Sequence, residues 1–161
     1  MSETQIKQAW ITSLRLLAST PKSSSELEAK LAEKGYPAEV VRATVEGLRS
    51  KGLLDDEAFA RQIASRLTAG KPSGNRRIAF ELKRRRVPAP VREEILEGLT
   101  EESERERARE TAKDKWEKWA ALAPDKRKKR TYDFLARRGF DFTVAREVVE
   151  ELSRAVTDAH R

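Results

Sequence analysis

One sequence pattern occurs three times along this chain, and it constrains the fold more than any other feature. The copies read LAEKGYPAEVVRATVEGL from Leu31, LKRRRVPAPVREEILEGL from Leu82 and LARRGFDFTVAREVVEEL from Leu135. They align without a gap, and their shared apolar positions are spaced by four, one and three residues, as on one buried helical face. These positions are Val40, Val91 and Val144; Thr44, Ile95 and Val148; Val45, Leu96 and Val149; and Leu48, Leu99 and Leu152. We therefore expect three copies of one helical unit.

The composition favours an all-α fold. Charged residues make up 38% of the 161 residues and aromatic residues 6%, with only 7 Gly and 6 Pro, which suits long exposed helices better than a sheet. Nine helices are predicted, near residues 4–18, 24–34, 38–50, 55–69, 75–86, 89–99, 101–122, 125–138 and 142–156. They group into three tandem three-helix repeats, over residues 1–52, 53–100 and 101–161. Repeats of this length commonly stack side by side, which predicts an elongated, curved array.

Two adjacent aspartates, Asp55 and Asp56, mark a predicted helix start. The carboxylate of Asp55 is placed to accept hydrogen bonds from the first free amides, and Asp56 lies at the positive end of the helix. A catalytic carboxylate pair is the alternative interpretation. Adjacent residues point in different directions at a helix start, and no base, nucleophile or metal partner is evident, so we prefer capping.

Further caps are predicted from local patterns. Ser23 and Glu26 have the spacing of a capping box, and Gly35 is suited to stop the helix that they begin. Ser73 or Asn75 is expected to cap the helix that follows the Gly/Pro turn.

The long predicted helix at 101–122 differs from its counterparts. Its first half is dominated by charge, with pairs such as Glu101/Arg105, Glu104/Arg107 and Glu106/Arg109 that would support a helix in water. Its second half carries an apolar stripe of Ala108, Ala112, Trp116, Trp119 and Ala123. We expect it to begin as a solvated strut between repeats and to end docked on the third repeat.

Several classes of function lack the residues that they need. The chain has no cysteine, and its single histidine is His160, so neither a thiolate metal site nor a histidine-based nucleophilic relay is expected. We predict no enzyme, no cofactor and no metal. No apolar run approaches the roughly 20 residues of a membrane span, and the first ten residues lack the apolar core of a signal peptide, so a cytoplasmic protein is expected.

The net charge of +7 is unevenly distributed, which suggests a polyanionic partner. Residues 71–86 hold seven basic residues and one acidic residue, and residues 126–138 hold the same numbers. These two blocks carry +12 together, so the rest of the chain sums to −5. The positive charge is therefore confined to two stretches, both on middle helices of repeats.

The basic residues of the two blocks also match each other in the repeat alignment. Arg76 aligns with Lys129, Arg77 with Arg130, Arg84 with Arg137 and Arg85 with Arg138, whereas the first repeat has Ser25, Glu26, Glu33 and Lys34. At 100° per residue, Arg76, Arg77, Lys83 and Arg84 fall within an arc of roughly 120°, away from Ile78, Ala79 and Leu82. Two such faces would form a stripe for a phosphate backbone or for an acidic protein groove. The alternative is that lysine and arginine merely solvate exposed helices.

The predicted binding residues are Lys71, Arg76, Arg77, Lys83, Arg84, Arg85, Lys129, Arg130, Arg137 and Arg138. Phe80 lies in the middle of the basic arc. We expect its ring to pack against the adjoining repeat, and the alternative is that it offers a face to an unpaired base. Trp10, Trp116 and Trp119 lie on helical stripes and are expected in the core.

The stretch from Leu53 to Val87 resembles a known family. LDDEAFARQIASR, a turn containing Gly and Pro, and RRIAFELKRR follow one another within a threefold repeat of three helices. This pattern resembles the RecX family of bacterial recombination regulators, over nearly the whole chain. The signature residues are Asp55, Asp56, Phe59, Ile78 and Leu82. The turn at 70–74 lacks the aromatic residue usual in the family, and Arg85-Arg86-Val87 replaces its frequent Lys-Gly-Ile.

The resemblance implies a regulator that is not itself an enzyme. RecX proteins bind the RecA recombinase, lodge in the groove of its filament on single-stranded DNA, and curb ATP hydrolysis, strand exchange and co-protease activity in DNA repair and the SOS response. The partners implied are thus the RecA filament and single-stranded DNA. No coiled-coil seam argues for a dimer, so we expect a monomer.

A stand-alone nucleic-acid binding module is the second hypothesis. Short helical packets are similar to helix-turn-helix units, but no helix shows a base-reading pattern beside a dimer interface. Weak, non-specific binding to duplex DNA is compatible with both hypotheses.

Overall fold

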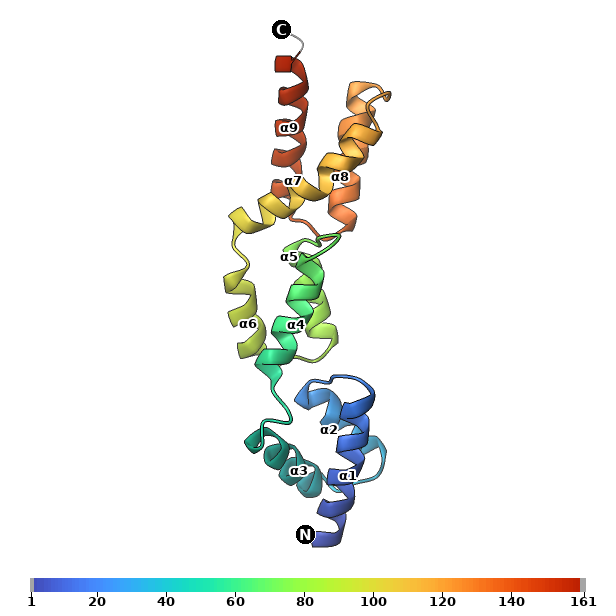
Figure 1. Ribbon diagram of the computed structural model, residues 1–161, viewed down its shortest axis with the longest axis vertical. Coiled ribbons are helices and arrows are strands. Elements are labelled where there is room, and N and C mark those ends of the chain that lie inside the picture. Colours follow the sequence, from blue (N-terminus) through green and yellow to red (C-terminus); the bar gives the residue numbers. More distant parts are fainter. Residues whose placement is uncertain (1, 160–161) are drawn as a thin grey trace. The chain divides into compact units, whose positions relative to one another are not determined.

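The computed structural model describes residues 2–159, and over this range the protein is all-α, as predicted (Figure 1). His160 lies outside the described residues. The helices are α1 (Glu3–Ser19), α2 (Ser24–Glu33), α3 (Ala38–Ser50), α4 (Asp56–Thr68), α5 (Asn75–Arg84), α6 (Ala89–Gly98), α7 (Glu101–Lys118), α8 (Pro124–Arg137) and α9 (Phe142–Ala159). No helix between residues 2 and 159 is long and apolar enough to cross a membrane.

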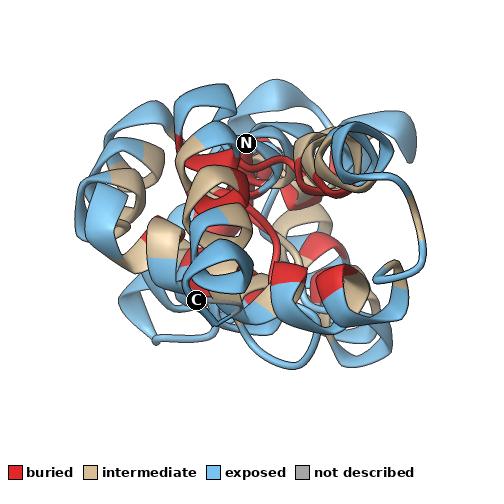
Figure 2. Ribbon diagram, turned by 90° about the horizontal axis from the view of Figure 1, so that it is seen from above, coloured by how far each residue is buried: buried red, intermediate tan, exposed pale blue. Residues whose placement is uncertain are grey.

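The chain divides into two compact units, and the division runs through the second repeat. The first unit comprises the residues up to 62 together with 82–93. The second comprises 63–81 and the residues from 94 onward. On several helices the buried residues lie on one side of the helix and the exposed residues on the other (Figure 2), as expected for amphipathic helices.

The core of the first unit is built from α1, α2 and α3. Its buried members are Leu27, Leu31, Val41, Val45, Leu48 and Leu54, with Trp10 and Tyr36 packed against them. The predicted capping box is present, because the Glu26 amide donates to the Ser23 hydroxyl and the Ser23 amide donates to the Glu26 carboxylate. Gly35 ends α2 with a φ of +88°, in the left-handed region that favours glycine.

Asp55 and Asp56 are structural residues of the first unit. The Ala58 amide donates to Asp55 Oδ1 at 3.0 Å, so Asp55 caps α4, and the helix begins one residue later than predicted. Asp56 Oδ1 accepts from the Ser24 amide at 2.8 Å, and its Oδ2 pairs with Arg49 at 3.3 Å. The two carboxylates thus have different partners. Asp55 holds the start of α4, and Asp56 binds the start of α2 and Arg49 near the end of α3.

The core of the second unit is built from α7, α8 and α9. Its buried members are Ala108, Ala112, Trp116, Leu135, Phe140, Val144, Ala145, Val148 and Val149. Trp119 is half-buried beside Phe134, and Ala123 is exposed, so the predicted apolar stripe is buried only as far as Trp116. Helix α7 ends at Lys118, earlier than the predicted residue 122, because the chain tightens into turns before Pro124 starts α8.

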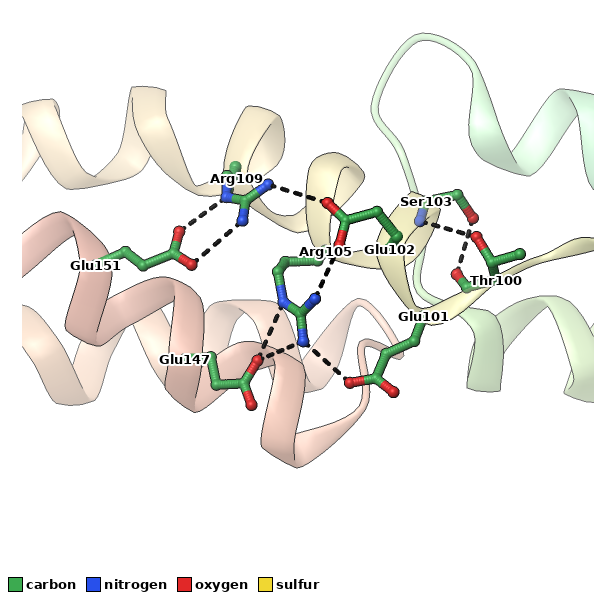
Figure 3. Close-up of polar contacts among 8 residues, drawn as sticks. All are labelled: Thr100, Glu101, Glu102, Ser103, Arg105, Arg109, Glu147 and Glu151. Atoms are coloured by element: carbon green, nitrogen blue, oxygen red, sulfur yellow. Dashed lines mark hydrogen bonds and ion pairs between the residues drawn. The ribbon is translucent and has the colours of Figure 1, made fainter.

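The first half of α7 is docked on α9, so the prediction of a solvated strut was wrong. Arg105 donates to Glu147 at 2.6 Å and also pairs with Glu101 and Glu102 at 3.0 Å each (Figure 3). Arg109 pairs with Glu151 at 2.8 Å. The hydrogen bond from Arg105 to Glu147 raises the pKa of the Arg105 guanidinium, and the bond from Arg109 lowers the pKa of Glu151. The charged face of α7 therefore binds a second helix.

Helix α6 departs from the repeat pattern. It carries no buried residue, whereas the matching positions of α3 and α9 are mostly buried. Val91, Ile95, Leu96 and Leu99 are all only partly buried. The expectation of three packets with the same buried face thus holds for the third helices of repeats one and three and fails for α6.

Candidate polyanion-binding surface

Two glycines bring the start of α5 against the end of α8 in the second unit. A Cβ added to Gly74 would lie 2.2 Å from the Gly139 oxygen, and one added to Gly139 would lie 2.4 Å from the Arg77 Cβ. The Gly74 amide donates to the Arg138 oxygen at 3.0 Å, and the Arg76 amide donates to the Gly139 oxygen at 3.1 Å. The two backbones are in direct contact, which only residues without a side chain permit.

This contact gathers basic residues from both predicted blocks. Lys71, Arg76, Arg77 and Arg137 are exposed, and Arg138 is half-buried. We call these five residues the α5–α8 basic cluster. They come from the turn before α5, the first turn of α5 and the last residues of α8, which are far apart in the sequence.

Two arginines of the cluster are held in defined positions. The Arg76 guanidinium donates to the Ala136 oxygen at 3.0 Å and lies 4.3 Å from the centroid of the Phe142 ring. Arg138 donates to the backbone oxygens of Pro72 and Lys71. Burial lowers the pKa of Arg138, and the neighbouring charge of Arg77 lowers it further. The like charges of Arg77 and Arg138 therefore lie close enough to repel each other, an arrangement that an anionic ligand would relieve.

A buried polar group beneath the cluster was missed by sequence reasoning. Glu104 is 4% exposed, and its Oε1 accepts from the backbone amides of Asn75 at 3.2 Å and Asp141 at 2.9 Å. Arg107 is 9% exposed and donates to the Ser73 oxygen and the Asn75 side chain. Burial lowers the pKa of Arg107, and the Glu104 charge acts in the opposite direction. One side chain of α7 thus binds the starts of both α5 and α9.

This group also corrects the predicted cap of α5. The amides of Asn75 and Arg76 donate to Glu104 and Gly139, which belong to the third repeat, in place of a local Ser73 or Asn75 cap. The Asn75 side chain instead donates to the Leu99 oxygen at 2.9 Å. These two orphan amides at the start of α5 are therefore satisfied by tertiary contacts.

The Arg85 side chain makes its contacts within the first unit. It pairs with Glu26 at 3.1 Å, donates to the Pro21 oxygen at 3.0 Å and lies 4.9 Å from the Phe59 ring centroid. Its own backbone oxygen accepts from the Ser23 hydroxyl at 2.8 Å. Arg85 thus holds the start of α2, and most of its donors are already used.

The remaining predicted residues lie outside the cluster. Lys83 and Arg84 are exposed and belong to the first unit. Lys129 pairs with Asp133 at 3.1 Å, and Arg130 lies 4.9 Å from the Trp119 ring centroid. The structure therefore brings Arg76 and Arg77 beside Arg137 and Arg138, whereas the alignment had matched them with Lys129 and Arg130.

Phe80 is 67% exposed, so its ring is not part of a core.

Among residues 2–159, no three His, Cys, Asp or Glu side chains are grouped so that they could hold a metal ion. The signature residues Phe59, Ile78 and Leu82 are 8%, 0% and 0% exposed, which makes them packing residues.

Comparison with known proteins agrees with this architecture. Family models described as the first, second and third three-helix domains of RecX match residues 9–48, 55–96 and 102–149. The chain belongs to the RecX family. Regulatory protein RecX of Mycolicibacterium vanbaalenii is 38% identical over 151 residues, which cover 89% of this chain and 81% of the relative. The RecX of Chlorobaculum tepidum is 33% identical over 150 residues, which cover 93% and 91%.

Solved structures of RecX share the fold. The crystal structure of RecX from Lactobacillus salivarius matches with a TM-score of 0.84 at 16% identity, over 94% of this chain and 98% of that chain. A second RecX crystal structure matches with a TM-score of 0.74 at 22% identity. The similar proteins of Mycolicibacterium vanbaalenii and Chlorobaculum tepidum are named as regulatory proteins.

Proposed function

We propose that this RecX-family protein regulates the RecA recombinase by binding its filament on single-stranded DNA, and that binding slows ATP hydrolysis, strand exchange and co-protease activity. Such a regulator acts in the cytoplasm, as a monomer, in recombinational repair. Membership of a family of regulatory proteins supports the proposal. The observation that carries it furthest is the α5–α8 basic cluster, because a recombinase filament on DNA presents a continuous polyanion.

The cluster is suited to this partner by its charge and its rigidity. Lys71, Arg76, Arg77 and Arg137 are exposed, and the backbone contact at Gly74 and Gly139 fixes the elements that carry them. Phosphate groups or the acidic side chains of a protein groove would neutralise this charge. The attraction is electrostatic, so binding should weaken as the salt concentration rises.

Co-sedimentation with RecA filaments tests the proposal. We expect wild-type protein to pellet with filaments assembled on single-stranded DNA and the double variant Arg77→Glu/Arg137→Glu to stay largely in solution. The matched control is Arg15→Glu/Arg42→Glu, which makes the same change in net charge at exposed residues of α1 and α3. The control should pellet like the wild type, and equal loss by both variants would contradict a role for the cluster.

The alternative of a stand-alone nucleic-acid module makes a different prediction. It requires a sharp, sequence-dependent affinity for duplex DNA that persists without RecA. Titration of duplexes of unrelated sequence separates the two functions, since the regulator should bind them all weakly and alike.

A further inference from the structure

Two phenylalanine rings near Arg76 are exposed in the second unit. The chain has 5 Phe, 3 Trp and 2 Tyr, all within the described residues, and only Phe80 and Phe142 are exposed, by 67% and 50%. Arg76 lies 4.3 Å from the centroid of the Phe142 ring. Phe80 follows Arg76 by four residues on α5, which places the two side chains about one turn apart on the same helical face.

Neither ring stabilises the core. The buried face of α5 holds Ile78 and Leu82, both 0% exposed, and Phe80 lies two residues from each, on the opposite side of the helix. Phe142 begins α9 ahead of its buried residues Val144 and Ala145. Burial of a phenylalanine side chain stabilises a protein by about 1.5–3 kcal/mol, so two exposed rings leave much of that gain unused.

We propose that Phe80 and Phe142 form a stacking platform for the unpaired bases of a single-stranded nucleic acid, with Arg76 beside the Phe142 ring and one turn from Phe80. The proposal rests on the proposed function and names the part of the polyanion that the surface recognises. A single strand presents base faces as well as phosphates, whereas a duplex hides its base faces by internal stacking. Two exposed rings next to exposed arginines therefore match a single strand better than a duplex.

The charges around the rings agree with this ligand. Arg77 lies three residues before Phe80 on α5, and Arg76 and Arg137 belong to the same basic cluster. The acidic neighbours in the sequence are Glu81, which is half-buried, and Asp141, whose carboxylate accepts from the amides of Thr143 and Val144. The carboxylate of Asp141 is thus occupied as a helix cap, and the net charge beside the rings is positive.

Binding of fluorescent oligonucleotides without RecA tests the platform. The probes are a single-stranded oligothymidine and a duplex of equal length, at one fixed salt concentration. For Phe80→Ala/Phe142→Ala we expect the single-strand affinity to fall on the order of tenfold or more, because stacking on aromatic side chains contributes to each bound base. Duplex affinity and the salt dependence should stay unchanged, since no charge is removed.

Three further variants serve as controls for this experiment. Phe80→Trp/Phe142→Trp should restore single-strand affinity, Ile11→Ala/Leu14→Ala should leave it unchanged as a control at exposed apolar residues of α1, and Arg77→Gln should weaken both ligands. The platform would be overturned if Phe80→Ala/Phe142→Ala lost affinity equally for both probes, or lost no affinity for the single strand. The platform would also be overturned if Phe80→Ala/Phe142→Ala bound the single strand normally but no longer pelleted with RecA filaments, since the rings would then contact the recombinase. If the phenylalanine variant loses single-strand affinity while wild-type protein ignores RecA, the platform stands and the proposed function falls.

Discussion

Glu104 on α7 accepts a hydrogen bond from the backbone amide of Asn75, the first residue of α5, at 3.2 Å. The same oxygen accepts from Asp141 next to the start of α9, and Arg107 lies nearby with its charge buried. Two helix starts are therefore held by one carboxylate, which also offsets a buried guanidinium. This carboxylate therefore holds the start of α5, which carries Arg76 and Arg77 of the α5–α8 basic cluster.

Glu104→Gln should destabilise the second unit by about 2–3 kcal/mol, because it removes the negative charge beside a buried guanidinium while keeping the shape. Urea unfolding measures the change. Glu106→Gln is the control, since Glu106 is exposed on the same helix, and it should change stability by less than about 0.5 kcal/mol. Similar midpoints for the two variants would show that the charge of Glu104 contributes no more to stability than that of an exposed residue.

Gly139→Ala should be more damaging than Gly35→Ala, although both glycines have φ near +85° (+84° and +88°). A Cβ at Gly35 meets nothing within 4 Å, so only the left-handed backbone costs about 1–2 kcal/mol. A Cβ at Gly139 would in addition lie 2.4 Å from Arg77 Cβ and force α5 and α8 apart. We expect a loss of about 3 kcal/mol or more, together with weaker filament binding. Equal thermal stabilities would refute the close contact.

Glu151→Gln tests the ion pairs between α7 and α9 through pH. The hydrogen bond from Arg109 holds the pKa of Glu151 below its unfolded value, so its contribution to stability is present above the ordinary glutamate pKa of about 4.3 and is lost as pH falls through the folded value. The difference in unfolding free energy between wild type and variant should be largest near neutral pH and vanish in acid. A difference that does not change with pH would argue against the pair.

Arg85→Gln should lower stability by about 1–2 kcal/mol and leave filament binding unchanged, because its guanidinium is paired with Glu26 inside the first unit. The exposed Lys83→Gln serves as its control for stability. Urea unfolding and co-sedimentation are the two measurements. Weak filament binding with normal stability would return Arg85 to the set of binding residues.

Helix positions were predictable wherever the signals were local. The capping box of Ser23 and Glu26 and the cap by Asp55 involve residues within one turn, and the structure contains both. The start of α5 was predicted at the right residue, but with the wrong cap, because its partners Glu104 and Gly139 belong to another repeat. Contacts between repeats leave no short-range pattern in a sequence.

The candidate surface was likewise predictable from the sequence only in part. The excess of positive charge in two blocks was evident from composition, whereas the meeting of Arg77 with Arg138 follows from two glycines packed back to back. Glu104 and Arg107 have the spacing of a surface ion pair, so burial alone distinguishes them from Glu101 and Arg105. The repeat alignment paired Arg77 with Arg130, whereas packing in the structure brings Arg77 beside Arg138.

The rate of RecA-catalysed ATP hydrolysis on single-stranded DNA tests the central claim most directly. We predict that stoichiometric wild-type protein slows hydrolysis, that Arg77→Glu/Arg137→Glu largely loses this effect, and that the control Arg15→Glu/Arg42→Glu keeps it. Hydrolysis that is unchanged by the wild-type protein, or slowed equally by both variants, would contradict the account.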